Sequence, residues 1–225
     1  MTFVCAGVSL YKKIMTDLQK ILYETAVVPV IKISDPAKAA PLAHALVKGG
    51  IRTAEITFRT DAAAESIRRM LDAEPDMIVG AGTVLTLRSL DDAVSAGSAF
   101  IVAPGLNPKI VTEAGRKNVP MVPGIMTPTE LEAALELGLD FVKFFPAEAA
   151  GGVKLLKAMS APYSMVKFMP TGGVTMANAG EYLSMKSVIC CGGSFIADDK
   201  LIEGGDFEQI TRNAAAVCEL AAEYR

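Results

Sequence analysis

Lys143 is the first residue whose setting suggests chemistry. It lies in the apolar run Phe141-Val142-Lys143-Phe144-Phe145, and strand alternation places Phe141, Lys143 and Phe145 on one face. Burial among aromatic rings disfavours the charged form of an amine. A neutral lysine amine attacks a carbonyl carbon and forms a Schiff base. A lysine that only pairs with a buried carboxylate fits the same pattern, so both interpretations stay open.

Two further lysines, Lys32 and Lys167, also fall in apolar runs. A place in a strand therefore does not by itself select a nucleophile. Lys143 has the most apolar neighbours of the three and lies near the end of its run, which favours it as the reactive lysine.

Glu55 is the natural partner for such a lysine. It lies in the run Thr53-Ala54-Glu55-Ile56-Thr57, where alternation groups Thr53, Glu55 and Thr57 on the inner face. A buried lone carboxylate is costly, so it needs a counter-charge. Paired with Lys143, Glu55 would supply a proton donor and acceptor beside an imine. A purely structural ion pair inside the core is the alternative.

Anion-binding residues follow three of the apolar runs. Arg59 comes soon after Glu55, and arginine binds carboxylate or phosphate through forked hydrogen bonds, although a solvated surface arginine has the same spacing. Two glycine pairs, in Thr171-Gly172-Gly173 and Gly192-Gly193-Ser194, end the last two runs. In parallel barrels these loops bind phosphate, together with a short helix N-terminus, which Ser194 to Ala197 would provide. Plain tight turns are the alternative for both pairs.

Short apolar runs that could position these residues recur along the whole chain. Most are rich in valine, isoleucine and phenylalanine, as buried parallel strands are. They are Val27 to Ile33, Thr53 to Thr57, Met77 to Ala81, Ala99 to Ala103, Pro120 to Val122, Phe141 to Phe145, Met165 to Met169 and Val188 to Cys191.

The segments between these runs read as helices, several with recognisable ends. Asp61 is a candidate N-cap, and Asn107-Pro108 and Thr127-Pro128 place a cap before a proline at the first helical position. The predicted helices are Tyr11 to Thr25, Asp35 to Val47, Asp61 to Leu71, Thr86 to Ala96, a segment beginning at Asn107, a segment from Thr127 to Gly138, Lys154 to Met159, Asn178 to Met185 and Phe207 to Tyr224.

Strands that alternate with helices indicate a parallel sheet. About eight such units in 225 residues match the number that closes a (β/α)8 TIM barrel. A doubly wound sheet is the structural rival, but it usually has fewer strands. We expect one α/β domain over residues 1–225, in which residues 1–26 form an N-terminal extension and helix.

Composition excludes several classes of function. A net charge of -3 argues against a nucleic-acid partner, and one histidine leaves no histidine-rich metal site. The four cysteines, without a C-x-x-C pair, are typical of reduced thiols in a cytoplasmic protein. No run resembles a secretory signal or a membrane span. We therefore expect no metal site and no membrane partner.

The segments around these residues resemble the 2-keto-3-deoxy-6-phosphogluconate (KDPG) and 4-hydroxy-2-oxoglutarate (KHG) aldolase family. The resemblance runs from about Val28 to the closing helix. It is carried by Val28-Pro29-Val30-Ile31, Glu55-Ile56-Thr57-Phe58-Arg59-Thr60, Gly80-Ala81-Gly82-Thr83-Val84, Pro104-Gly105-Leu106, Val122-Pro123-Gly124, Lys143-Phe144-Phe145-Pro146-Ala147-Glu148, Pro170-Thr171-Gly172-Gly173-Val174 and Gly192-Gly193-Ser194.

The resemblance implies a class I aldolase, without a cofactor, that is typically homotrimeric. Its substrates would be a phosphorylated keto acid and pyruvate. By the family pattern Lys143 forms the Schiff base and Glu55 is the general acid and base. The other positions matched to the family's substrate site are Arg59 and Thr83 for the pyruvate carboxylate, Pro104, Phe145 and Thr171 in the pocket, and Gly172, Gly173, Gly193 and Ser194 for phosphate.

One branch of the family is distinguished by a single residue. The related 6-phosphogalactonate aldolases lack the arginine that Arg59 matches, so its presence favours the gluconate type. Phe58 and Phe195 stand where leucine and tryptophan are common, and both keep an apolar side chain. Another phosphate-binding barrel lyase or isomerase, or a non-catalytic sugar-phosphate binder, are the alternatives.

Overall fold

The computed structural model describes residues 3–225, with side chains from residue 10 onward. Its strands are short, parallel and buried. They are β1 (Val27–Ile31), β2 (Thr53–Thr57), β3 (Ile78–Gly82), β4 (Ile101–Val102), β5 (Met121–Val122), β6 (Gly124–Ile125), β7 (Phe141–Phe144), β8 (Lys167–Pro170) and β9 (Cys191–Gly193).

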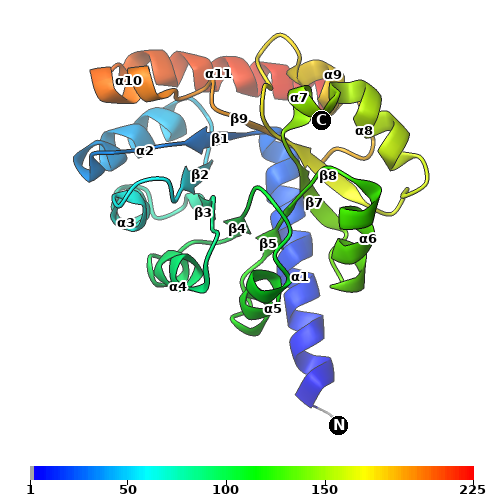
Figure 1. Ribbon diagram of the computed structural model, residues 1–225. Coiled ribbons are helices and arrows are strands. Elements are labelled where there is room, and N and C mark those ends of the chain that lie inside the picture. The colour runs from blue at the N-terminus through cyan, green and yellow to red at the C-terminus, as the bar shows by residue number, and fades with distance from the viewer. Residues whose placement is uncertain (1–2) are drawn as a thin grey trace.

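The strands close into a ring (Figure 1). Hydrogen bonding orders them β5-β4-β3-β2-β1-β9 in one sheet and β6-β7-β8 in another. The chain runs directly from β5 to β6 through Pro123, which has no N–H and so interrupts one strand. A parallel bridge between Thr171 and Gly192 joins β8 to β9. With β5 and β6 taken as one interrupted strand, the predicted eight-stranded barrel is confirmed.

Helices surround the ring, one or more after each strand. Two short helices, α7 and α10, are present that the sequence did not predict. The helical segments are α1 (Phe3–Thr25), η1 (Pro36–Lys38), α2 (Ala39–Lys48), α3 (Ala63–Ala73), α4 (Leu87–Ser95), α5 (Pro108–Arg116), α6 (Pro128–Glu136), α7 (Ala147–Ala150), α8 (Gly152–Ser160), α9 (Ala179–Leu183), α10 (Asp199–Gly204) and α11 (Phe207–Tyr224).

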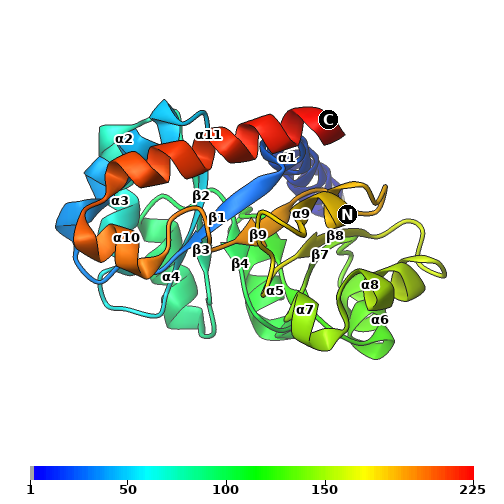
Figure 2. The same ribbon diagram turned by 90° about the horizontal axis from the view of Figure 1, so that it is seen from above.

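The first helix packs at the end of the barrel where the strands begin. Met15, Leu18 and Leu22 of α1 are buried, and the Tyr11 hydroxyl accepts a hydrogen bond of 3.3 Å from the Met121 N–H at the start of β5. In Figure 2, α1 and α11 lie together on one side of the ring. The N-terminal helix is thus present and begins earlier than its periodicity predicted. Among residues 3–225, no helix has the length and apolar character needed to cross a bilayer.

Most of the predicted helix ends agree with the structure, and two expectations at loop ends are wrong. Asn107 and Thr127 cap α5 and α6 through their side chains. Asp61 does not cap α3, because the helix begins two residues later and Ala62 takes the cap position. Ser194 to Ala197 forms a turn rather than a helix, and the following short helix starts at Asp199.

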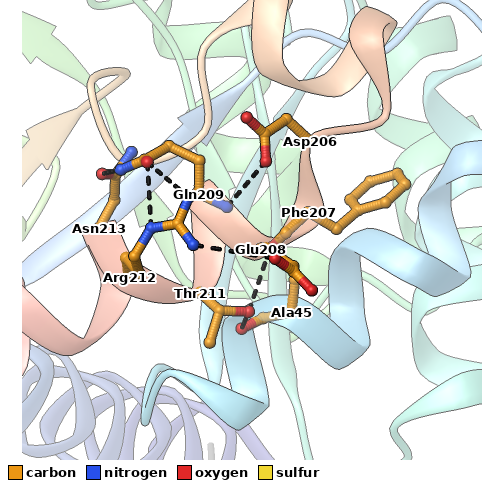
Figure 3. A network of polar contacts seen from close by, with 8 residues as sticks. All are labelled: Ala45, Asp206, Phe207, Glu208, Gln209, Thr211, Arg212 and Asn213. Atoms are coloured by element: carbon orange, nitrogen blue, oxygen red, sulfur yellow. Dashed lines mark hydrogen bonds and ion pairs between the residues drawn. The ribbon is translucent and has the colours of Figure 1, made fainter.

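The closing helix is tied to its neighbour α2 and is capped at its start. Thr211 donates 3.1 Å from Oγ1 to the Ala45 carbonyl of α2, a contact drawn in Figure 3. Asp206 caps the helix by accepting from the Gln209 N–H at 3.0 Å. The rotation of α11 is fixed by its buried side chains, Ile210, Ala214, Val217 and Ala221, and these contacts supplement that packing.

Candidate active site

A buried ion pair lies inside the barrel. Lys143 Nζ of β7 is 3.3 Å from Glu55 Oε1 of β2, and the two side chains are only 6% and 1% exposed. Alternation along each strand turns both inward, and the register places Lys143 beside Gly124 and Glu55 beside Val30 and Gly80. Strands from opposite parts of the sequence thus deliver one amine and one carboxylate to the same interior point.

Only one oxygen of the Glu55 carboxylate has a hydrogen-bond partner among the described residues. Oε1 accepts from Lys143, whereas the buried Oε2 has no hydrogen-bond partner among the described residues. Buried polar atoms are normally paired, and an exception calls for a functional explanation. A free carboxylate oxygen beside a buried amine is suited to accept a proton from a bound molecule.

Room for the carboxylate comes from a glycine whose role the sequence did not reveal. A Cβ on Gly82 of β3 would lie 2.1 Å from Glu55 Oε1 and 2.7 Å from Glu55 Cγ. Both separations are far below van der Waals contact, so a side chain at position 82 excludes the observed Glu55 position. The only sequence signal was a small residue at a strand end.

A cavity opens at the carboxyl ends of β8 and β9, next to this pair. Its volume is about 140 Å³, and Phe145 connects it to the amine, since Lys143 Nζ lies 5.4 Å from the Phe145 ring centre. We call it the β8–β9 cavity. Its lining residues are Val30, Arg59, Phe145, Thr171, Gly172, Gly173, Val174, Gly192 and Ser194.

Arg59 and Thr83 lie together at the neighbouring ends of β2 and β3. Both line a second hollow there, and Arg59 also borders the β8–β9 cavity. The Arg59 Nε donates 3.2 Å to Thr57 Oγ1. Thr83 has a φ of 56°, a left-handed conformation that β-branched residues rarely adopt. Such strained positions cluster at functional sites.

Two predicted site residues, Gly193 and Pro104, do not line the β8–β9 cavity. Gly193 lies within β9 between two residues that line the β8–β9 cavity. Pro104 follows β4 and is half-buried, and it borders neither hollow. Its carbonyl instead packs beside Gly124, where a Cβ would lie 2.1 Å from it. The remaining predicted residues form the ion pair or line one of the two hollows.

The histidine and the described cysteines lie outside this cluster. His44 is on α2, where its Nδ1 lies 2.7 Å from Glu74 Oε1, so it is remote from the strand ends. Burial raises the pKa of the Cys190 and Cys191 thiols, which keeps them protonated and unreactive. Cys218 is half-buried and free, and Cys5 lies outside the described side chains. In the part of the chain from residue 10 on, no three histidine, cysteine or acidic side chains gather as a metal site would require.

Comparison with known proteins agrees with this geometry. The family described as "KDPG and KHG aldolase" matches residues 18–213. The "KHG/KDPG aldolase" of Escherichia coli is 44% identical over 204 residues, which cover 91% of this chain and 96% of that protein.

Two solved structures have closely similar folds. KDPG aldolase from Legionella pneumophila, solved with pyruvate captured at low pH as a covalent carbinolamine intermediate, has a TM-score of 0.85 and 38% identity, covering 88% of this chain and 97% of the other. The Zymomonas mobilis aldolase solved with 3-phosphoglycerate has a TM-score of 0.84 and 38% identity, covering 94% and 97%. With its matching strand-end residues and buried lysine–glutamate pair, the chain belongs to the KDPG and KHG aldolase family.

Proposed function

We propose that this protein is a class I aldolase that cleaves KDPG to pyruvate and D-glyceraldehyde 3-phosphate. It also cleaves 4-hydroxy-2-oxoglutarate to pyruvate and glyoxylate. The observation that carries the proposal is the Lys143 amine, buried against a carboxylate whose Oε2 has no partner among the described residues. The Escherichia coli relative bears the names of both activities, and Arg59 favours the gluconate type of substrate.

The reaction begins at the keto group. The Lys143 amine attacks C2, and loss of water leaves an iminium that withdraws electrons from C3. Glu55 takes the proton of the C4 hydroxyl, directly or through a water molecule. The C3–C4 bond then breaks, its electron pair enters the iminium to form an enamine, and the aldehyde leaves. Protonation of C3 and addition of water release pyruvate and restore the amine.

The two ends of the substrate are held by different groups. Arg59 and Thr83 bind the carboxylate next to C2, with forked arginine hydrogen bonds to its oxygens. Pro104, Phe145 and Thr171 shape the pocket between them. The phosphate binds the backbone of the loops after β8 and β9, at Gly172, Gly173, Gly193 and Ser194. The Zymomonas mobilis structure with 3-phosphoglycerate supports a phosphate site in this family.

Borohydride trapping tests the nucleophile. Incubation with pyruvate and borohydride is expected to reduce the iminium and leave a stable adduct on Lys143, found by mapping the peptides by mass. Omission of pyruvate is the control. No adduct, or an adduct on Lys167 instead, would contradict the assignment.

Cleavage measured in EDTA should be unchanged. Activity that is lost in EDTA and then restored by a divalent ion would point to a metal-dependent aldolase.

A Gly82→Ala variant tests the position of the Glu55 carboxylate. Because the added methyl group excludes the observed place of Glu55, we expect kcat/KM for KDPG cleavage to fall about 100-fold, the usual cost of misplacing a catalytic group by about 1 Å. Steady-state kinetics measures this, with a circular dichroism spectrum to check the fold. Unchanged kinetics in the folded variant would show that the carboxylate position is not critical.

The active assembly is proposed to be a cytoplasmic homotrimer. Three exposed apolar side chains at one end of the barrel, Leu85, Leu87 and Met126, are suited to cover one another between subunits. Sedimentation equilibrium is expected to give three times the chain mass of 23.7 kDa. A monomer mass at micromolar concentration would contradict the trimer.

A further inference from the structure

The loop that follows β8 is anchored by hydrogen bonds donated to its carbonyl groups. Every carbonyl from Thr171 to Gly173 accepts a hydrogen bond from a group outside these three residues. The donors are Ala147 N to Thr171 O at 2.8 Å, Glu148 N to Gly172 O at 3.0 Å and Asn178 Nδ2 to Gly173 O at 3.2 Å.

This arrangement directs the amide groups of the same peptides the other way. In a trans peptide the carbonyl and the following N–H point in opposite directions. The N–H groups of Gly172, Gly173 and Val174 therefore point away from the supporting donors. Those of Gly173 and Val174 donate to no described residue, whereas the bridge between Thr171 and Gly192 engages the Gly172 N–H. All three residues line the β8–β9 cavity. Successive free backbone amides in a concave loop bind anions.

Tight packing against the loop explains why residue 173 is a glycine. Gly173 has a φ of 80°, and a Cβ there would lie 2.6 Å from Glu148 Cβ. The loop is thus pressed against α7, and its backbone has little freedom to turn.

The turn that follows β9 is anchored by one side chain of α11. Asn213 Nδ2 donates to the carbonyls of Phe195 at 3.4 Å and Ile196 at 3.0 Å. Both follow Ser194, which lines the same cavity. The side chain sits in the polar network at the start of α11, beside Gln209 and Arg212 (Figure 3).

A hydrogen bond accepted by the side-chain oxygen sets the orientation of each asparagine amide. Asn178 Oδ1 accepts from the Thr175 N–H at 2.7 Å, and Asn213 Oδ1 accepts from Gln209 Nε2 at 2.8 Å. Because the amide oxygen is already occupied by a donor, the NH₂ group must face the loop carbonyls. Gln209 is itself held, since its Oε1 accepts from Arg212 Nη2 at 2.8 Å.

We infer that Asn178 and Asn213 are positioning residues for the substrate phosphate. Neither needs to touch the phosphate. Asn178 holds the Gly173 carbonyl outward, so that the Val174 N–H stays aimed into the cavity, and Asn213 fixes the turn directly after Ser194, which lines the same cavity. These loop groups therefore need no reorganisation when the phosphate binds. The inference rests on the proposed function, because it assumes a phosphorylated substrate in the β8–β9 cavity.

The test compares a phosphorylated with an unphosphorylated substrate. In Asn178→Ala and Asn213→Ala we expect KM for KDPG and the inhibition constant for inorganic phosphate each to rise about tenfold, the effect of one lost hydrogen bond. We expect kcat/KM for 4-hydroxy-2-oxoglutarate, which has no phosphate, to stay within about twofold of wild type.

Thr211→Val is the matched control. It removes a hydroxyl from the same helix and network, one that bonds Ala45 and Phe207 rather than the loop, and it should leave both substrates unaffected. Equal losses on both substrates in the asparagine variants would mean a general structural role and would overturn the proposal, as would an unchanged KM for KDPG. Failure of the wild-type protein to cleave KDPG would instead refute the proposed function itself.

Discussion

Replacing Lys143 by methionine is expected to lower kcat/KM for KDPG cleavage by on the order of 10⁴-fold or more, the scale seen when a covalent nucleophile is removed. Methionine fills similar space but has no amine to attack C2, so no iminium forms and no electron sink replaces it. Borohydride and pyruvate should then leave no adduct. A variant that kept its activity within tenfold of wild type would remove Lys143 from the mechanism.

The same substitution has a consequence for stability that must be separated from catalysis. It leaves the Glu55 carboxylate, 1% exposed, without its counter-charge, and breaking a buried pair in this way costs about 3–5 kcal/mol. The double variant Lys143→Met with Glu55→Gln removes both charges and should recover part of that loss in urea unfolding. It should nevertheless stay inactive, because the amine is still absent.

A matched control uses the lysine of the neighbouring strand. Lys167 begins β8 and donates 3.0 Å to the carbonyl of Lys186, away from the cavity residues. Lys167→Met removes the same charge from a barrel strand, and it should keep cleavage activity near wild type. Equal inactivation of both lysine variants would indicate a loss of fold rather than of a nucleophile.

Replacing Glu55 by glutamine is expected to lower kcat for cleavage about 10²- to 10⁴-fold, the usual contribution of a positioned general acid or base. Glutamine keeps the shape of the side chain and a hydrogen-bonding oxygen for Lys143, but it cannot take the C4 hydroxyl proton. The ion pair then becomes a single buried ammonium, so unfolding in urea should be monitored alongside.

The Glu55→Gln variant separates bond cleavage from Schiff-base formation. Prolonged incubation with pyruvate and borohydride should still label Lys143, because the amine remains, although its proton transfers are slower. Rapid-quench kinetics with KDPG would locate the slow step. A variant that cleaves KDPG at the wild-type rate would limit Glu55 to the structural ion pair that its sequence pattern also allowed.

Much of the barrel was predictable because its signals are local. Strand β2 and helix α11 have the predicted bounds, since alternation and a long amphipathic repeat leave little choice of period. Asn107 and Thr127 were recognisable as caps from two or three residues each. The continuation of the interrupted strand beyond Pro123, as β6, and the turn at Ser194 to Ala197 depended on neighbours remote in sequence, and they were not predicted.

The candidate site, like the fold, was predictable from the sequence only where its signals are local. Alternation alone determined that Lys143 and Glu55 face inward, and their family resemblance suggested their roles, which stay predictions until they are tested. Their 3.3 Å separation required the barrel to close, because they are 88 positions apart in the sequence.

Gly82, Asn178 and Asn213 gave no usable signal, since a glycine or a carboxamide on a strand or helix has many ordinary uses. Only tertiary structure gave them their settings, by bringing a carboxylate to 2.1 Å from one missing methyl group and loop carbonyls within reach of two amides. The periodicity of a sequence determines which way a side chain points, whereas only the packed chain determines what it meets.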